Sequence, residues 1–73
     1  MYYFKKDKYM EMLDGRTVEW LARQIGYNNM TLYAIFNGRR GCKRGLALGI
    51  VKTLNDDYRV DDYFYEIDNK EGN

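Results

Sequence analysis

The sequence has no histidine and no proline, and it has a single cysteine among its 73 residues. Without an imidazole, mechanisms that need a histidine base or a histidine metal ligand are excluded. One cysteine forms neither an internal disulfide nor a cluster of thiolates around a metal. The seven glycines fit neither of the phosphate-binding patterns GxxxxGK[ST] and GxGxxG. We therefore expect no catalysis, no metal, no cofactor and no small-molecule substrate.

Long hydrophobic runs are also missing. The longest nearly apolar stretch, residues 45–51, is far shorter than the roughly 20 residues that cross a membrane. The first residues do not lead from a cationic segment into an apolar one, so no secretory signal is expected. An apolar fraction of 45% together with 32% charged residues is typical of a globular chain. These features predict a cytoplasmic protein without a membrane partner.

The net charge of +1 conceals an uneven distribution along the chain. Residues 16–54 carry seven basic side chains and one acid, Glu19, whereas residues 55–73 have a net charge of −5. A basic central segment is typical of a protein that binds a polyanion. The alternative is an uneven surface with no such partner, which is common in small domains.

Glycine and asparagine divide the chain into short segments in which apolar residues recur with helical spacing. Thr17 is a suitable N-cap for the second segment, and Asn28 or Asn29 caps the third. Residues 60–65 are compatible with one helical turn or with a short strand. Helices are expected over about 4–13, 17–25, 28–36 and 45–54.

The predicted fold is all-α, a compact bundle of four to five short helices around one core. We expect one domain over residues 1–67 and a disordered tail over residues 68–73. The predicted core consists of the apolar residues at helical spacing, namely Tyr9, Leu13, Val18, Leu21, Ala22, Ile25, Leu32, Ile35, Phe36, Leu46, Ile50, Val51 and Leu54.

Residues 18–37 have the spacing of a helix-turn-helix. This motif needs a small residue where its two helices cross, a glycine in the turn and apolar residues on the inner side of the second helix. Ala22 is small, and Gly26 follows four residues later. Leu32 and Ile35 supply the inner side of the second helix.

The residues of this motif resemble a known family. Residues 21–27, Leu-Ala-Arg-Gln-Ile-Gly-Tyr, are similar to the LAxxxG pattern of the Cro/C1-type (XRE-like) helix-turn-helix family. Residues 37–40, Asn-Gly-Arg-Arg, resemble the NGxR that ends its recognition helix, and residues 60–64 resemble its fifth-helix signature. The resemblance spans roughly residues 9–65 and implies a lambda-repressor-like DNA-binding domain.

The resemblance also implies which residues contact DNA. Residues 28–36 would lie in the major groove of double-stranded operator DNA, which a homodimer binds at a pseudo-palindrome. The implied base contacts are Asn28, Asn29, Met30 and Tyr33. The implied phosphate contacts are Thr17, Asn37, Arg39, Arg40, Lys43 and Arg44. Alternatively, the asparagine pair only caps a helix, and the basic residues lie in a solvated loop.

The implied function is that of a small transcriptional regulator encoded by a bacteriophage or mobile element, in the cytoplasm of a bacterial host cell. One alternative is a modulator or anti-repressor that binds a partner phage repressor through the same surface, and another is an antitoxin. A dimer surface is expected within residues 58–67. The candidate protein interface consists of aromatic residues, Trp20, Tyr58, Tyr63, Phe64 and Tyr65. Alternatively, Trp20 packs against neighbouring tyrosines.

Overall fold

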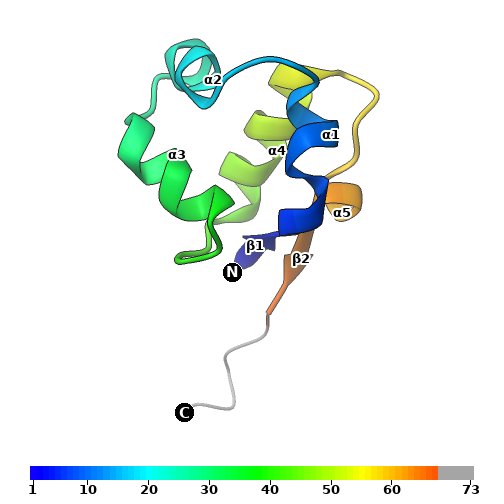
Figure 1. Cartoon of the computed structure of the whole chain (residues 1–73). Helices are drawn as coiled ribbons and strands as arrows, with labels where there is room; N and C mark the ends of the chain where they lie inside the picture. Colours follow the sequence, from blue (N-terminus) through cyan, green and yellow to red (C-terminus); the bar gives the residue numbers. More distant parts are fainter. Residues whose placement is uncertain (68–73) are drawn as a thin grey trace.

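The computed structural model describes residues 1–67, which form a mostly helical unit with a short two-stranded sheet at one end (Figure 1). The expected tail, residues 68–73, lies outside the described residues. No helix within residues 1–67 is both long and apolar enough to cross a membrane. In chain order the elements are β1 (Tyr2–Phe4), a 3-10 helix η1 (Lys6–Lys8), α1 (Tyr9–Leu13), α2 (Val18–Ile25), α3 (Asn29–Phe36), α4 (Arg44–Leu54), α5 (Val60–Tyr63) and β2 (Phe64–Glu66).

Helices α2 and α3 begin where the sequence predicts. The Thr17 Oγ1 accepts a hydrogen bond from the backbone N–H of Trp20 at 3.0 Å, and the Asn28 Oδ1 accepts one from Met30 at 2.6 Å. Each cap satisfies an amide that the first turn of a helix leaves unpaired. Gly26 ends α2 with a φ of 76°, a left-handed conformation that glycine adopts readily. These signals make the connection between α2 and α3 short.

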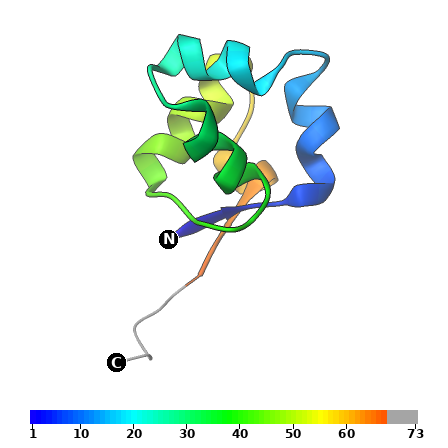
Figure 2. The ribbon, with the colours of Figure 1, turned by 60° about the vertical axis from the view of Figure 1, so that its left-hand side comes forward.

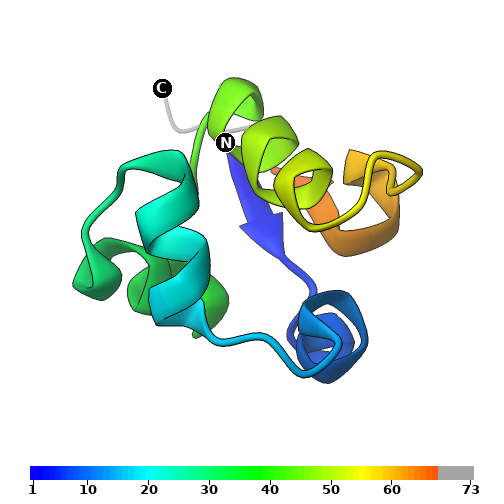
Figure 3. The ribbon, with the colours of Figure 1, turned by 90° about the horizontal axis from the view of Figure 1, so that it is seen from above.

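The helices enclose one core. Helix α4 packs against α1, α2 and α5, while α3 packs against α2 and β1. Figure 2 shows α3 below α2, with α4 on one side and α1 on the other, and Figure 3 shows the helices around β1. Of the predicted core, Tyr9, Ile25 and Leu46 are only partly buried at its edge. The others are confirmed as buried: Leu13, Val18, Leu21, Ala22, Leu32, Ile35, Phe36, Ile50, Val51 and Leu54.

The described chain is mostly helical, as predicted, but its two ends form a short two-stranded sheet that the all-α prediction does not contain. Of the helix predicted over 4–13, residues 6–13 are helical as η1 and α1, whereas Phe4 belongs to β1, which pairs antiparallel with β2 so that Phe4 lies opposite Phe64. Both rings are buried, and the Phe4 ring also lies edge-on to Phe36 with 4.9 Å between the ring centres. Aromatic residues favour extended backbone that packs on a core. Phe64, the pairing partner of Phe4, lies 60 residues later in the sequence. The spacing of apolar residues within a short segment does not predict a pairing over that distance.

The alternatives for residues 60–65 are both present. Val60 and Tyr63 are buried by the single turn of α5, and the chain becomes extended at Phe64 to form β2. Strand β2 therefore follows α5 directly, without an intervening loop.

The loop from α3 to α4 is fastened to β1. Tyr2 and Cys42 exchange two backbone hydrogen bonds, of 2.7 and 2.8 Å. Gly41 lies so close to β1 that an added Cβ would approach ring carbons of Tyr3 to 2.9 Å and the Tyr2 carbonyl oxygen to 3.0 Å. The backbone of the predicted basic loop is thus anchored at its C-terminal end. Cys42 is buried, and this burial raises the pKa of its thiol.

Candidate functional site

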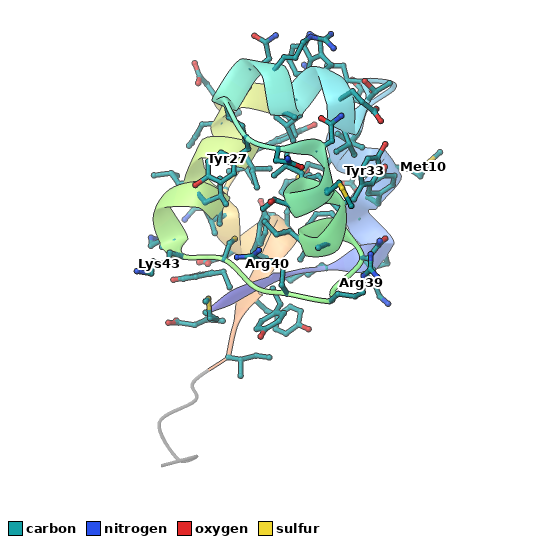
Figure 4. The ribbon with its side chains drawn as sticks, turned by 90° about the vertical axis from the view of Figure 1, so that its left-hand side faces the viewer. Met10, Tyr27, Tyr33, Arg39, Arg40 and Lys43 are labelled. Atoms are coloured by element: carbon teal, nitrogen blue, oxygen red, sulfur yellow. The ribbon has the colours of Figure 1, made fainter. Side chains whose placement is uncertain are left out.

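Helix α3 has one buried and one exposed side. Leu32, Ile35 and Phe36 face the core, whereas the Met30 side chain on the other side is 79% exposed. Figure 4 views this exposed side together with the loop that follows it. We define the α3 face by exposed residues of α3 and its flanking loops, namely Tyr27, Asn28, Asn29, Met30, Tyr33, Asn37, Arg39, Arg40 and Lys43. The structure therefore brings together the four predicted base-contact residues and four of the predicted phosphate-contact residues.

The two asparagines at the start of α3 have different local roles. Asn28 is the N-cap, so its Oδ1 is engaged with the helix, as the capping alternative predicts. The Nδ2 amine of the same side chain donates two further hydrogen bonds in principle, because an amide carries both an acceptor and a donor group. Asn29 is the first helical residue and is exposed. Capping therefore does not remove the hydrogen-bonding capacity of this end of α3.

Tyr33 is tied to α2 by a contact that the sequence did not reveal. Its Oη donates a hydrogen bond to the Oε2 of Glu19 at 2.5 Å. This hydrogen bond raises the pKa of the Tyr33 phenol and lowers the pKa of the Glu19 carboxyl. In the sequence, Glu19 is explained by its place in the first turn of α2, where an acid suits the helix dipole. Its contact with a residue 14 positions later follows only from the packing of α2 on α3.

The basic residues of the loop remain available to an anion. Arg39, Arg40 and Lys43 are exposed, and Figure 4 shows them on the same side of the molecule as Tyr27 and Tyr33. Within residues 1–67, the one ion pair shorter than 4.0 Å joins Lys8 and Glu11, away from the loop. Because no acidic side chain of the described chain neutralises them, the three cations make this end of the α3 face electropositive.

Two predicted phosphate contacts lie apart from these three. Arg44 is the first residue of α4, and its Nη1 donates a hydrogen bond to the Tyr2 hydroxyl at 3.0 Å. Its guanidinium also lies over the Tyr2 ring, 5.7 Å from the ring centre. Thr17 lies at the N-terminus of α2, where its hydroxyl is engaged as a cap. The Arg44 side chain is therefore held against β1. Thr17 lies at the start of α2, away from the basic loop that follows α3.

Lys6 is a basic residue of this region that sequence reasoning missed. Its side chain lies beside Gly38, with Cδ 3.5 Å from the position that a Cβ on Gly38 would take. Lys6 and the predicted phosphate-contact residue Asn37 line one open groove of about 360 Å³, together with Tyr9, Tyr33 and Phe36. No sequence signal predicts this, because the place of Lys6 beside Gly38 depends on how η1 lies against the end of α3.

A second open groove, of about 260 Å³, adjoins the first. It is lined by residues around the start of α2, among them Arg16, Thr17 and Glu19, and it shares Tyr9 and Tyr33 with the first groove. The two grooves therefore follow one side of α3 from the start of α2 to the end of α3.

The predicted aromatic protein interface needs correction. Tyr63 and Phe64 are inaccessible to a partner, because their side chains are only 5% and 1% exposed. Burial raises the pKa of Tyr63 to about 12, and the Tyr58 ring packs against it with 4.9 Å between ring centres. The sequence leaves open whether residues 60–65 form a helical turn or a strand, and the inward direction of Tyr63 and Phe64 follows from the turn of α5 and from the pairing of β2 with β1.

Trp20 and Tyr65 differ from those three residues. Trp20 is half-buried against the core, and the Arg16 guanidinium lies 5.3 Å from its ring centre. Its contacts with the core and with an arginine account for its partial burial. Tyr65 is 47% exposed and stacks on Tyr3 across the sheet. Of the predicted interface, Tyr65 is the most accessible member.

Within residues 1–67, no three metal-ligating side chains come together at one place. Comparison of the chain with family models, with curated proteins and with solved structures finds no match. The functional interpretation therefore rests on the residues and geometry of the α3 face.

Proposed function

We propose that this chain is a small helix-turn-helix transcriptional regulator that binds double-stranded DNA with α3 in the major groove. The observation that carries the proposal is the α3 face itself. Exposed amides at the start of α3 and unneutralised cations after its end lie on one side, while the other side of α3 is buried. An α-helix with its side chains is roughly as wide as the major groove, about 12 Å.

The chemistry of α3 favours A·T base pairs. An asparagine amide forms two hydrogen bonds with the N6 and N7 of adenine, and apolar side chains contact the thymine methyl group. Asn29 offers such an amide, and Met30 offers an exposed apolar contact. Helix α3 contains no arginine or lysine, so it lacks the side chains that commonly read guanine.

The cations after α3 would hold the DNA backbone. Arg39 and Arg40 would neutralise phosphates on one flank of the groove, and each neutralised phosphate changes the salt dependence of binding by about 0.9 in a plot of log K against log salt. Thr17, at the start of α2, is placed for a contact with the same backbone on the other side of Tyr33. These contacts fix the position of α3 without reading the sequence.

The double variant Arg39→Ala, Arg40→Ala tests this function. It should weaken binding to duplexes of every sequence. The slope of log K against log salt should decrease by about 1.8, the value expected for the loss of two phosphate contacts. Fluorescence anisotropy with a labelled duplex at several salt concentrations measures both. The matched control is Lys52→Ala, because Lys52 lies on α4 and its Nζ donates to the Asp56 carbonyl. A double variant that binds DNA as tightly as the control would contradict the proposal.

We further propose that a second copy of the chain pairs along β2, which allows a two-fold operator to be bound. The backbone bonds from Lys5 to Tyr63 and from Ile67 to Met1 alternate along the sheet. By this alternation the N–H of Glu66 and the C=O of Phe64 point away from β1. Such unpaired groups on an edge strand favour pairing with another strand.

A modulator that binds a partner repressor is the second candidate function. It is supported by exposed apolar side chains on or beside the α3 face, among them Met30 at 79% and Met10 at 81% exposure. Methionine adapts well to protein surfaces. If the chain is a modulator, changing Met10 and Met30 to serine should abolish its complex with the partner protein. The same changes should leave its affinity for DNA unaltered. No comparable observation supports an antitoxin.

A further inference from the structure

Glu19 is an unusual residue for the surface on which it lies. It is the one acidic residue between positions 15 and 55 of a segment that is otherwise basic. It lines the same groove as Thr17, where a DNA backbone would pass. A carboxylate there repels phosphates, so its presence weakens binding to DNA of any sequence. A residue with that cost needs a compensating role.

The role is suggested by the contact with Tyr33. The Glu19 Oε2 accepts the Tyr33 hydroxyl hydrogen at 2.5 Å, which joins the first turn of α2 to the middle of α3. Tyr33 is 37% exposed, so without this bond its ring is free to change rotamer at the surface. Arg23, one turn further along α2, favours the charged form of Glu19, in which the carboxylate is a strong acceptor.

We propose that Glu19 is a specificity-determining residue that positions the Tyr33 ring on the α3 face before DNA is bound. This inference rests on the proposed function. It adds that the Tyr33 side chain is fixed in its binding position before DNA is present. Fixing a surface side chain on binding costs conformational entropy. A ring that is already fixed avoids this cost at the correct site, where it contacts a base. At a random site, where only phosphates are contacted, the position of the ring has no effect.

Variants of the two residues separate the hydrogen bond from the charge. Glu19→Ala removes both, Tyr33→Phe removes only the hydrogen bond, and Glu19→Gln keeps an acceptor but removes the charge. We expect Glu19→Ala and Tyr33→Phe each to reduce the ratio of selected-site to random-site affinity about fivefold, equivalent to about 1 kcal/mol. Glu19→Gln should retain most of that ratio, while its affinity for random duplex rises because the repulsion is gone. Glu11→Gln, on α1, is the matched control for loss of one negative charge.

The experiment uses the full chain with two probes, the duplex that it selects from a randomised pool and a duplex of scrambled sequence. Urea unfolding of each variant shows whether the fold is retained. The double variant Glu19→Ala, Tyr33→Phe should reduce the affinity ratio no further than either single change, because both act through one contact.

Additive losses in the double variant, an unchanged ratio in Glu19→Ala, or a ratio in Glu19→Gln as low as in Glu19→Ala would overturn the inference and leave the proposed function standing. A wild-type chain that selects no duplex would overturn both.

Discussion

Under the proposed function, the Asn28 side chain would have both a structural and a recognition task. Its Oδ1 caps α3, and the residue is exposed, so that its amine would be available to a base. Asn28→Ala should reduce the free energy of unfolding by about 1 kcal/mol, the usual cost of losing an N-cap. Asn28→Asp should preserve stability, because aspartate also caps, yet weaken DNA binding because it lacks the amine and is repelled by phosphates.

Urea unfolding and anisotropy on the same preparations measure the two tasks of Asn28 separately. An Asn28→Asp variant that binds DNA like the wild type would show that this residue is only a cap. An Asn28→Ala variant of unchanged stability would contradict the capping assignment.

Gly41 is the residue whose small size matters most for the basic loop. Because an added Cβ would lie 2.9 Å from the Tyr3 ring and 3.0 Å from a backbone oxygen, Gly41→Ala should lower the free energy of unfolding by about 1–3 kcal/mol. Gly49, inside α4, is the matched control because an added Cβ there meets no atom within 4 Å. Gly49→Ala should raise stability by roughly 0.5–1 kcal/mol. Equal effects of the two changes in urea unfolding would contradict the close contact between loop and strand.

At the scale of elements, the outer edge of β2 is where a second copy is expected. Glu66→Pro removes the outward N–H without removing a hydrogen bond to β1, and proline is tolerated on an edge strand. Sedimentation equilibrium should show a dimer for the wild type and a monomer for Glu66→Pro, with similar thermal unfolding when both are dilute. Glu66→Ala, which keeps the N–H, should remain dimeric. A dimer that persists in the proline variant would show that the copies meet elsewhere.

The ends of α2 and α3 were predictable from the sequence because their signals are local. Thr17, Gly26 and Asn28 act on backbone groups within a few residues of themselves. The pairing of β1 with β2 was not predictable in this way. Phe4 and Phe64 pair and pack their rings against each other, although they lie near opposite ends of the described chain. Helical spacing therefore places Phe4 at the start of a helix, whereas the chain is extended at that residue and becomes helical from Lys6.

The same distinction applies to the candidate site. The prediction that Leu32, Ile35 and Phe36 face inward leaves Asn29 and Met30 on the surface, and both are exposed. Lys6 and Glu19 were missed, because their places beside Gly38 and Tyr33 depend on how η1 and α2 pack on α3. The inward direction of Tyr63 depends on the turn of α5, one of the two alternatives that the sequence leaves open for residues 60–65.

At the scale of the whole molecule, the charge is arranged in two regions. Arg39, Arg40 and Lys43 give the α3 face a positive end, whereas exposed acids gather around α5, among them Asp61 and Asp62. Under the proposed function, a small net charge with this separation would orient the chain toward DNA without attracting it strongly. We therefore expect weak binding to random duplexes, with discrimination between sequences by the α3 face.

The most direct test of DNA reading by α3 is selection of duplexes from a randomised pool by the full chain at about 0.1 M salt, where nonspecific attraction is partly screened. The account predicts enrichment of a two-fold symmetric site rich in A·T pairs, and loss of that enrichment in Asn29→Ala. A pool that stays random after repeated rounds, with only weak salt-sensitive binding, would contradict it.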